Sequence, residues 1–186
     1  PAWVEKPLVI SVEELVNIRK KMLSNKLCYA VGYNRSFSPW TNFMKNKINS
    51  QKTDISMTVN ADTLPIDHWL LDEETCGGRI IGEFCHFVDL ALTLLNHTKL
   101  ISVECINRNR YYQDTGNYVL NFQDGSKVNI DYRHDLPAQV PKEKIVVKVS
   151  NRTYINNNWK KFSNGKIFDI NFIGKGKGHK EAMATF

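Results

Sequence analysis

The chain changes character at Asn96, and this change constrains the fold more than any other feature. Upstream of it, apolar residues recur mainly at helical spacing, whereas downstream short segments rich in β-branched and aromatic residues follow one another. Asp124-Gly125 and Asn164-Gly165 supply hairpin turns between such segments. The predicted strands are residues 99–108, 116–125, 126–134, 142–151, 152–158, 159–165 and 166–173. We therefore predict an α+β domain with a large, mainly antiparallel (mixed) sheet and helices packed on one face.

The upstream half predicts helices with recognisable starts. Ser11 and Glu14 form a capping box before a helix that extends to Asn25. Ser38 caps the next helix, and Pro39 takes its first position. Residues 26–34 and 52–61 are typical of strands, and a loop over 62–78 leads into a third helix.

The composition indicates an ordinary globular chain and excludes several classes. Of the 186 residues, 42% are hydrophobic, which excludes a disordered protein. The net charge of +6 is scattered and forms no aromatic-interleaved basic stripe, so we predict no nucleic-acid partner. No signal peptide and no apolar run of membrane-spanning length occurs, and the four cysteines form no CxxC pair. We therefore predict a cytoplasmic protein without a membrane partner.

The third helix carries polar residues that a purely structural helix would not need. Arg79, Glu83, His86 and Asp89 fall on one stripe about a third of the circumference wide. The rest of the surface is apolar, so these groups either pair with each other or face a cleft, because unpaired buried charges are costly. A solvated face and a hydrogen-bonded core histidine remain open alternatives. No ligand pair has the i, i+4 spacing that zinc on a helix favours, so we predict no metal site.

Three motifs in order resemble the glucose-fructose oxidoreductase/inositol dehydrogenase (Gfo/Idh/MocA) family of NAD(P)-dependent enzymes. They are "EKPL" at 5–8, "VGYNRSFSP" at 31–39, and Gly77-Gly78 leading to "GEFCHFVDL" at 82–90. The segment 65–90 is similar to members associated with surface-polysaccharide and sugar-nucleotide metabolism. The final "GHKEAMATF" resembles the start of the family's late helix.

This resemblance implies a two-domain enzyme. Residues 1–36 would be the end of an N-terminal Rossmann domain, and 37–186 the C-terminal substrate and oligomerisation domain. The cofactor would be NAD or NADP, but the G-x-G-x-x-G motif that binds its pyrophosphate is missing from this sequence. "GKGKG" at 174–178 follows a strand of the wrong domain and has different spacing. The isolated chain is therefore expected to be inactive.

The resemblance also assigns roles to individual residues. Lys6, with Glu5 and Pro7, would lie at the nicotinamide, where Lys6 orients substrate or relays a proton. His86 matches the family's acid/base histidine. The family usually has an aspartate four residues before this histidine, and here that position is Gly82. Glu83 could substitute, since residues three or four apart on a helix can meet.

The substrate would be a sugar, a sugar nucleotide or a polyol, oxidised at a CH–OH group. The candidates for binding it are Asn34, Arg35, His68 and Arg79, and guanidinium groups suit anionic substrates. Arg35 as a helix cap and His68 as loop packing are the alternatives. A homo-oligomer through the sheet face is also implied. A non-catalytic binding or assembly module with the same fold remains the second hypothesis for the function.

Overall fold

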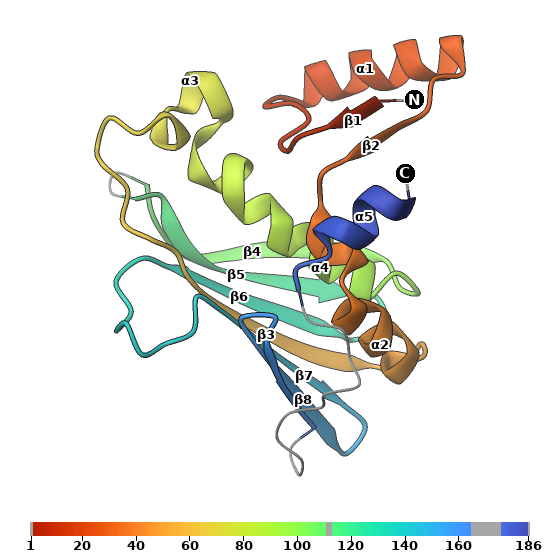
Figure 1. Ribbon diagram of the computed structural model, residues 1–186, viewed down its shortest axis with the longest axis vertical. Coiled ribbons are helices and arrows are strands. Elements are labelled where there is room, and N and C mark those ends of the chain that lie inside the picture. Colours follow the sequence, from red (N-terminus) through yellow and green to blue (C-terminus); the bar gives the residue numbers. More distant parts are fainter. Residues whose placement is uncertain (1, 111–112, 165–175, 186) are drawn as a thin grey trace.

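A seven-stranded mixed sheet carries most of the structure. The computed structural model describes residues 2–110, 113–164 and 176–185 (Figure 1). The strands of this sheet are β3 (Thr53–Asn60), β4 (Leu100–Asn109), β5 (Thr115–Phe122), β6 (Lys127–Arg133), β7 (Glu143–Val149), β8 (Arg152–Asn157) and β9 (Lys161–Ser163). They follow the order β4-β5-β6-β3-β7-β8-β9. Only β3 and β6 run parallel, and the other neighbours are antiparallel. The predicted fold class is confirmed.

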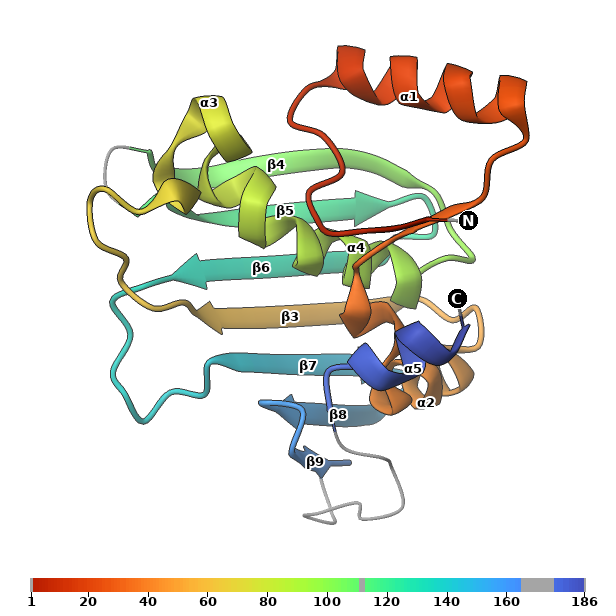
Figure 2. The ribbon, with the colours of Figure 1, turned by 45° about the horizontal axis from the view of Figure 1, so that its top comes forward.

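Two helices pack on one face of the sheet and enclose the core. They are α2 (Pro39–Ile48) and α4 (Cys85–Leu94), and both lie on the same side of the strands (Figure 2). Their apolar stripes meet the inward-facing side chains of β3, β6 and β7. Fully buried members of this core include Trp40, Met44, Phe87, Leu90, Ile55, Ile130 and Val147. Burial of this continuous apolar surface is the main stabilising contribution to the domain.

The start of α2 is as the sequence predicts. The Ser38 hydroxyl accepts a hydrogen bond from the amide of Thr41 at 3.0 Å, and Pro39 takes the first helical position. The Thr41 hydroxyl in turn donates to the Arg35 carbonyl. These bonds fix the short 3-10 helix η1 (Asn34–Phe37) against the start of α2.

The helix predicted after the diglycine does not begin as an α-helix. Gly77 and Gly78 both have positive φ, which ends the short helix α3 (Glu73–Cys76). A π-helical turn, η3 (Ile80–Phe84), then leads into α4. Turns of this type are rare and occur frequently at functional sites. The wider turn shifts the residues before Cys85 relative to a regular helical wheel.

A small separate layer precedes the sheet domain. Strand β1 (Ala2–Val4) pairs in parallel with β2 (Tyr29–Val31), and helix α1 (Val12–Asn25) connects them (Figure 1). The predicted capping box of α1 is present in full. No residue of α1 is buried, and the side chains of Val12 and Leu23 are 78% and 71% exposed. This layer therefore presents an apolar surface that the described chain does not cover.

Helix α5 (His179–Thr185) confirms the helix predicted near the C-terminus. It contacts η1 and lies near β2 (Figures 1 and 2). The strand predicted over 166–173 falls outside the described residues. Among the helices described, none combines the length and the apolar character that a bilayer span requires.

Candidate active site

One cavity joins residues that lie far apart in the sequence. Its volume is about 250 Å³. Four of the predicted site residues line it: Glu5, Lys6, Asn34 and His86. The other lining residues are Trp3, Gly32, His179 and Met183. The cavity therefore lies where the β1–β2 layer, η1, α4 and α5 meet.

Lys6 reaches the cavity from the segment that follows β1. Its ammonium group donates a hydrogen bond to the carbonyl oxygen of Gly82, at 2.5 Å, in the π-helical turn. An ammonium has three N–H donors, so two remain for a ligand or water. The carbonyl fixes the position of the charge and leaves it able to bind an oxygen atom in the cavity.

His86 lies in the first turn of α4 and is only 7% exposed. Its ring packs edge-on against Tyr33, with the centroids 5.8 Å apart. Burial, together with the positive charges of Arg35 and Lys6, lowers the pKa of His86 to about 3. The imidazole is therefore neutral at physiological pH. A neutral imidazole can accept a proton.

The Nδ1 atom of His86 is buried and has no hydrogen-bond partner among the described residues. Buried polar atoms are nearly always hydrogen-bonded, because leaving one unpaired is costly. The cost of this unpaired nitrogen is a structural feature of the first turn of α4 beside the cavity.

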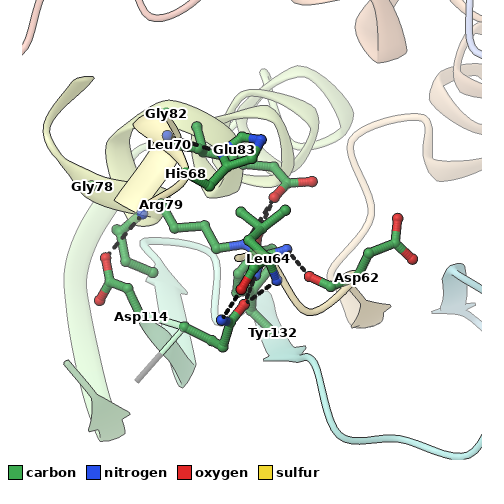
Figure 3. A network of polar contacts seen from close by, with 12 residues as sticks. Asp62, Leu64, His68, Leu70, Gly78, Arg79, Gly82, Glu83, Asp114 and Tyr132 are labelled. Atoms are coloured by element: carbon green, nitrogen blue, oxygen red, sulfur yellow. Dashed lines mark hydrogen bonds and ion pairs between the residues drawn. The ribbon is translucent and has the colours of Figure 1, made fainter. Parts of the chain in front are cut away.

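The guanidinium group of Arg79 forms hydrogen bonds to other residues of the protein. It is 1% exposed and donates to the Glu83 carboxylate, the Tyr132 hydroxyl, the Gln113 side chain and the Asp62 carbonyl (Figure 3). All three of its guanidinium nitrogens are occupied, and it does not line the cavity. The structure thus places this predicted substrate residue in the network that joins η3 to the sheet.

The structure does not bring Glu83 to His86. The Glu83 carboxylate accepts hydrogen bonds from Arg79 at 3.0 Å and from Tyr132 at 2.5 Å, and the residue does not line the cavity. The wheel of a regular α-helix does not apply across the π-helical turn. Glu83 therefore holds Arg79 in place.

The position where the family has an aspartate is also closed. A Cβ atom added to Gly82 would lie 2.6 Å from Cδ1 of Leu70 and 3.5 Å from Sγ of Cys76. Leu70 thus occupies the space into which a longer side chain would project. Figure 3 shows Leu70 directly beside Gly82. A side chain at position 82 would therefore require Leu70 to move.

Arg35 is held by a buried carboxylate. Its guanidinium forms a two-pronged pair with Glu143, at 2.9 and 2.7 Å, and Glu143 is 3% exposed. Lys177 and the indole N–H of Trp159 donate to the same carboxylate. Burial alone would raise the pKa of Glu143, but Arg35 and Lys177 outweigh it and hold the pKa at about 2. Arg35 does not line the cavity, although its charge acts on His86.

Asn34 lines the cavity, whereas His68 lies outside it. Asn34 is buried, lines the cavity and donates through Nδ2 to the carbonyl of Lys177 at 2.9 Å. His68 accepts from the amide of Leu70 through Nδ1 and stacks on Trp69. It does not line the cavity.

Asp89 is the last member of the polar stripe, and its carboxylate accepts a hydrogen bond from the Ser36 hydroxyl. Burial raises its pKa, and the Ser36 hydroxyl partly offsets that rise. This contact ties α4 to η1 and agrees with a structural role for the residue.

His179, Lys177 and Glu143 were not among the site residues predicted from the sequence. "GHKEAMATF" was assigned only as a helix, and Glu143 lay inside a predicted strand. Arg35 and Glu143 are 108 positions apart, and Asn34 and Lys177 are 143 apart, so no local pattern could connect them. In the described part of the chain, no group of three His, Cys, Asp or Glu side chains could hold a metal ion.

A second hollow lies next to the cavity. It has a volume of about 550 Å³ and runs between α1, the 3-10 turn η2 (Trp69–Leu71) and the loop after Lys6. Pro7, the third residue of the predicted cofactor motif, lines it together with Trp69 and Cys76. The Lys6–Pro7 step therefore separates the two hollows.

Comparison with known proteins identifies the fold. No family model matches the sequence, and no curated protein does. Solved structures do match. A dehydrogenase from Clostridium difficile has a TM-score of 0.71 and 16% identity, over 98% of this chain and 60% of its own. An inositol dehydrogenase homologue from Azotobacter vinelandii, solved with NAD⁺, has a TM-score of 0.76 and 15% identity, over 94% of this chain and 52% of its own.

An aldose-aldose oxidoreductase from Caulobacter crescentus has a TM-score of 0.77 and 12% identity, over 96% of this chain and 58% of its own. The chain thus spans between half and two thirds of the length of these structures. At such identities the likeness concerns the fold alone. This chain therefore shares the fold of these oxidoreductase structures, which is the fold that the resemblance of its three motifs implied.

Proposed function

We propose that this chain is the substrate-binding and catalytic half of an NAD(P)-dependent oxidoreductase. It would act on a CH–OH group of a sugar, sugar nucleotide or polyol. One observation carries the proposal: Lys6 and His86, 80 positions apart, line one cavity. Removal of a hydride from an alcohol requires an acceptor for the hydroxyl proton, and an imidazole nitrogen can accept one.

Each residue then has a defined task. His86 accepts the proton of the substrate hydroxyl. Lys6, held by the Gly82 carbonyl, donates from its free N–H groups to the same oxygen and stabilises the negative charge that develops on it.

We propose that the nicotinamide lies at Glu5, Lys6 and Pro7. These residues border space on both sides, because Glu5 and the Lys6 cation line the cavity and a larger hollow opens at Pro7. When bound, the nicotinamide would supply the hydride acceptor. We further propose that residues 1–36 belong to the dinucleotide-binding domain, which would cover the exposed apolar side chains of α1.

Subunits are proposed to pair through the sheet face opposite α2 and α4. The helices leave this face open, and Asp54, Ser56 and Asn129 on it are exposed (Figure 2). Light scattering of the intact protein tests the proposal, and substitution of Asn129 by a larger charged residue should shift the mass toward the monomer. An unchanged mass would place the contact elsewhere.

The test of the function uses the intact protein that contains this chain. It is assayed for reduction of NAD⁺ and NADP⁺ with D-glucose, myo-inositol, D-glucuronate and UDP-N-acetylglucosamine. Turnover of at least one pair is expected. Absence of turnover with every pair, in a folded protein that binds dinucleotide, would contradict the proposal.

One observation favours a non-catalytic module. Leu70 fills the space beside Gly82, so no carboxylate stands where the family has its aspartate. Under this second function the cavity would bind a ligand without oxidising it. Calorimetry with the same four compounds would then give binding, and reduced cofactor would not form.

A further inference from the structure

We propose that His179 is a second substrate-facing histidine, which hydrogen-bonds a hydroxyl group away from the reacting carbon. This inference rests on the proposed function and deepens it, because it adds a residue that selects among substrates. His179 belongs to the last described helix, 93 positions from His86, and both line the same cavity of about 250 Å³.

Helix α5 forms one wall of this cavity. His179 and Met183 both line it. Residues four apart share one face of a helix. The face that they define therefore borders the cavity, which Trp3 of β1 and Gly32, just after β2, also line. A ligand in so small a space would contact both walls.

The backbone before His179 is fixed by close packing. Gly178 has φ +90°, and a Cβ atom there would lie 2.3 Å from the Asn34 carbonyl oxygen and 2.6 Å from the Ser38 amide nitrogen. Only glycine fits a contact between two backbones at this distance. The first turn of α5 is thus held against η1, which itself supplies Asn34 to the cavity.

Lys177 forms hydrogen bonds through both its backbone carbonyl and its side-chain ammonium, and these bonds fix the same segment. Its carbonyl accepts from the Asn34 side chain at 2.9 Å, and its ammonium donates to Glu143. Glu143 is buried and also binds Arg35, the residue after Asn34. The segment is therefore tied twice to the η1 turn. Groups held this firmly by their neighbours are suited to orient a ligand.

The two histidines differ in a way that suits different tasks. His86 is buried, and burial keeps its imidazole neutral. His179 is exposed, so its ring can change hydrogen-bond partner with little desolvation. An imidazole can donate and accept, and each hydroxyl of a sugar or polyol can do the same. His179 therefore distinguishes substrates by the hydroxyl that they place opposite His86.

The experiment uses the intact protein and the same four probe compounds. His179→Ala removes the bond, His179→Gln retains a donor and an acceptor, and Lys180→Gln is the control on the same helix. For His179→Ala we expect KM to rise about tenfold and kcat to change less than about threefold, as expected for one lost hydrogen bond to substrate. His179→Gln should recover most of the loss, and Lys180→Gln should match the wild type.

Kinetic constants of His179→Ala equal to those of the wild type would overturn the inference and leave the proposed function intact. If no probe is turned over, the proposed function fails, and histidine ring signals in NMR titrations with the same probes decide the role of His179. Shifts of both the His86 and the His179 rings would support the inference. Shifts of His86 alone, or of neither ring, would overturn it.

Discussion

Replacement of Glu143 by glutamine should destabilise the fold more than any other change of one charge discussed above. The Glu143 side chain is 3% exposed. One carboxylate oxygen accepts from Nε of Arg35 and from the Trp159 indole, and the other accepts from Nη2 of Arg35 and from Lys177. A glutamine has one acceptor oxygen, so two of these four donors would face its NH₂ group.

The magnitude follows from the charge left behind. Without the carboxylate, the buried Arg35 has lost its counter-charge, and breaking a buried pair in this way costs roughly 3–5 kcal/mol of unfolding free energy. Such a loss would be a large fraction of the roughly 5–15 kcal/mol typical of a domain. The measurement is urea unfolding followed by circular dichroism, with equal slopes required for the comparison.

Glu73→Gln is the matched control. Glu73 binds Arg110 through the same two-pronged geometry, at 3.1 and 2.9 Å, but both side chains are more than half exposed. Water and salt screen such a pair, so the control should change the unfolding free energy little. If the two variants lose equal stability, burial does not set the strength of the Glu143 cluster and the reasoning is refuted.

Three further predictions concern the residues around the cavity. Because His86 has a folded pKa of about 3, below the ordinary histidine value of 6.5, the unfolded chain binds more protons between these values and stability should fall as pH drops through them. His86→Gln should reduce this slope in urea titrations at several pH values, and an unchanged slope would exclude His86 as its source. Gly82→Asp should lower the thermal midpoint, and Leu70→Ala should partly restore it in the double variant; simple additivity of the two losses would contradict the steric explanation. Tyr132→Phe should cost about 1–3 kcal/mol, because it removes the hydroxyl that accepts from Arg79 and donates to the Glu83 carboxylate, and chemical unfolding measures this; no loss would show that the Arg79–Glu83 pair holds without this hydroxyl.

The elements that could be predicted depend on neighbours in the sequence. The capping box at Ser11 and the Ser38-Pro39 start involve residues within a few positions, and both are present. The large sheet could be predicted for the same reason, because the alternation of apolar and polar residues along a strand involves only neighbouring positions. The meeting of Lys6 with His86 was predicted only through the family resemblance.

The interactions that escaped prediction are long-range or depend on side-chain packing. Nothing near Arg35 in sequence indicates that Glu143 would bind it, so its guanidinium looked free for substrate. Glu83 pairs with Arg79 four positions before it and with Tyr132 of β6, and the wheel alone could not exclude His86 as its partner. The position of Leu70 beside Gly82 was equally invisible, since it depends on how the 62–78 loop folds back.

The central claim is that His86 carries out acid/base chemistry in the cavity that it shares with Lys6. The most direct test is the rate of cofactor reduction by the intact protein with His86→Gln, on whichever probe the wild type oxidises. We predict a loss in kcat of about 10²- to 10⁴-fold with unchanged folding, as expected when a positioned proton acceptor is removed. A kcat within about twofold of the wild type would contradict the assignment of His86, because removal of a true proton acceptor costs far more than this.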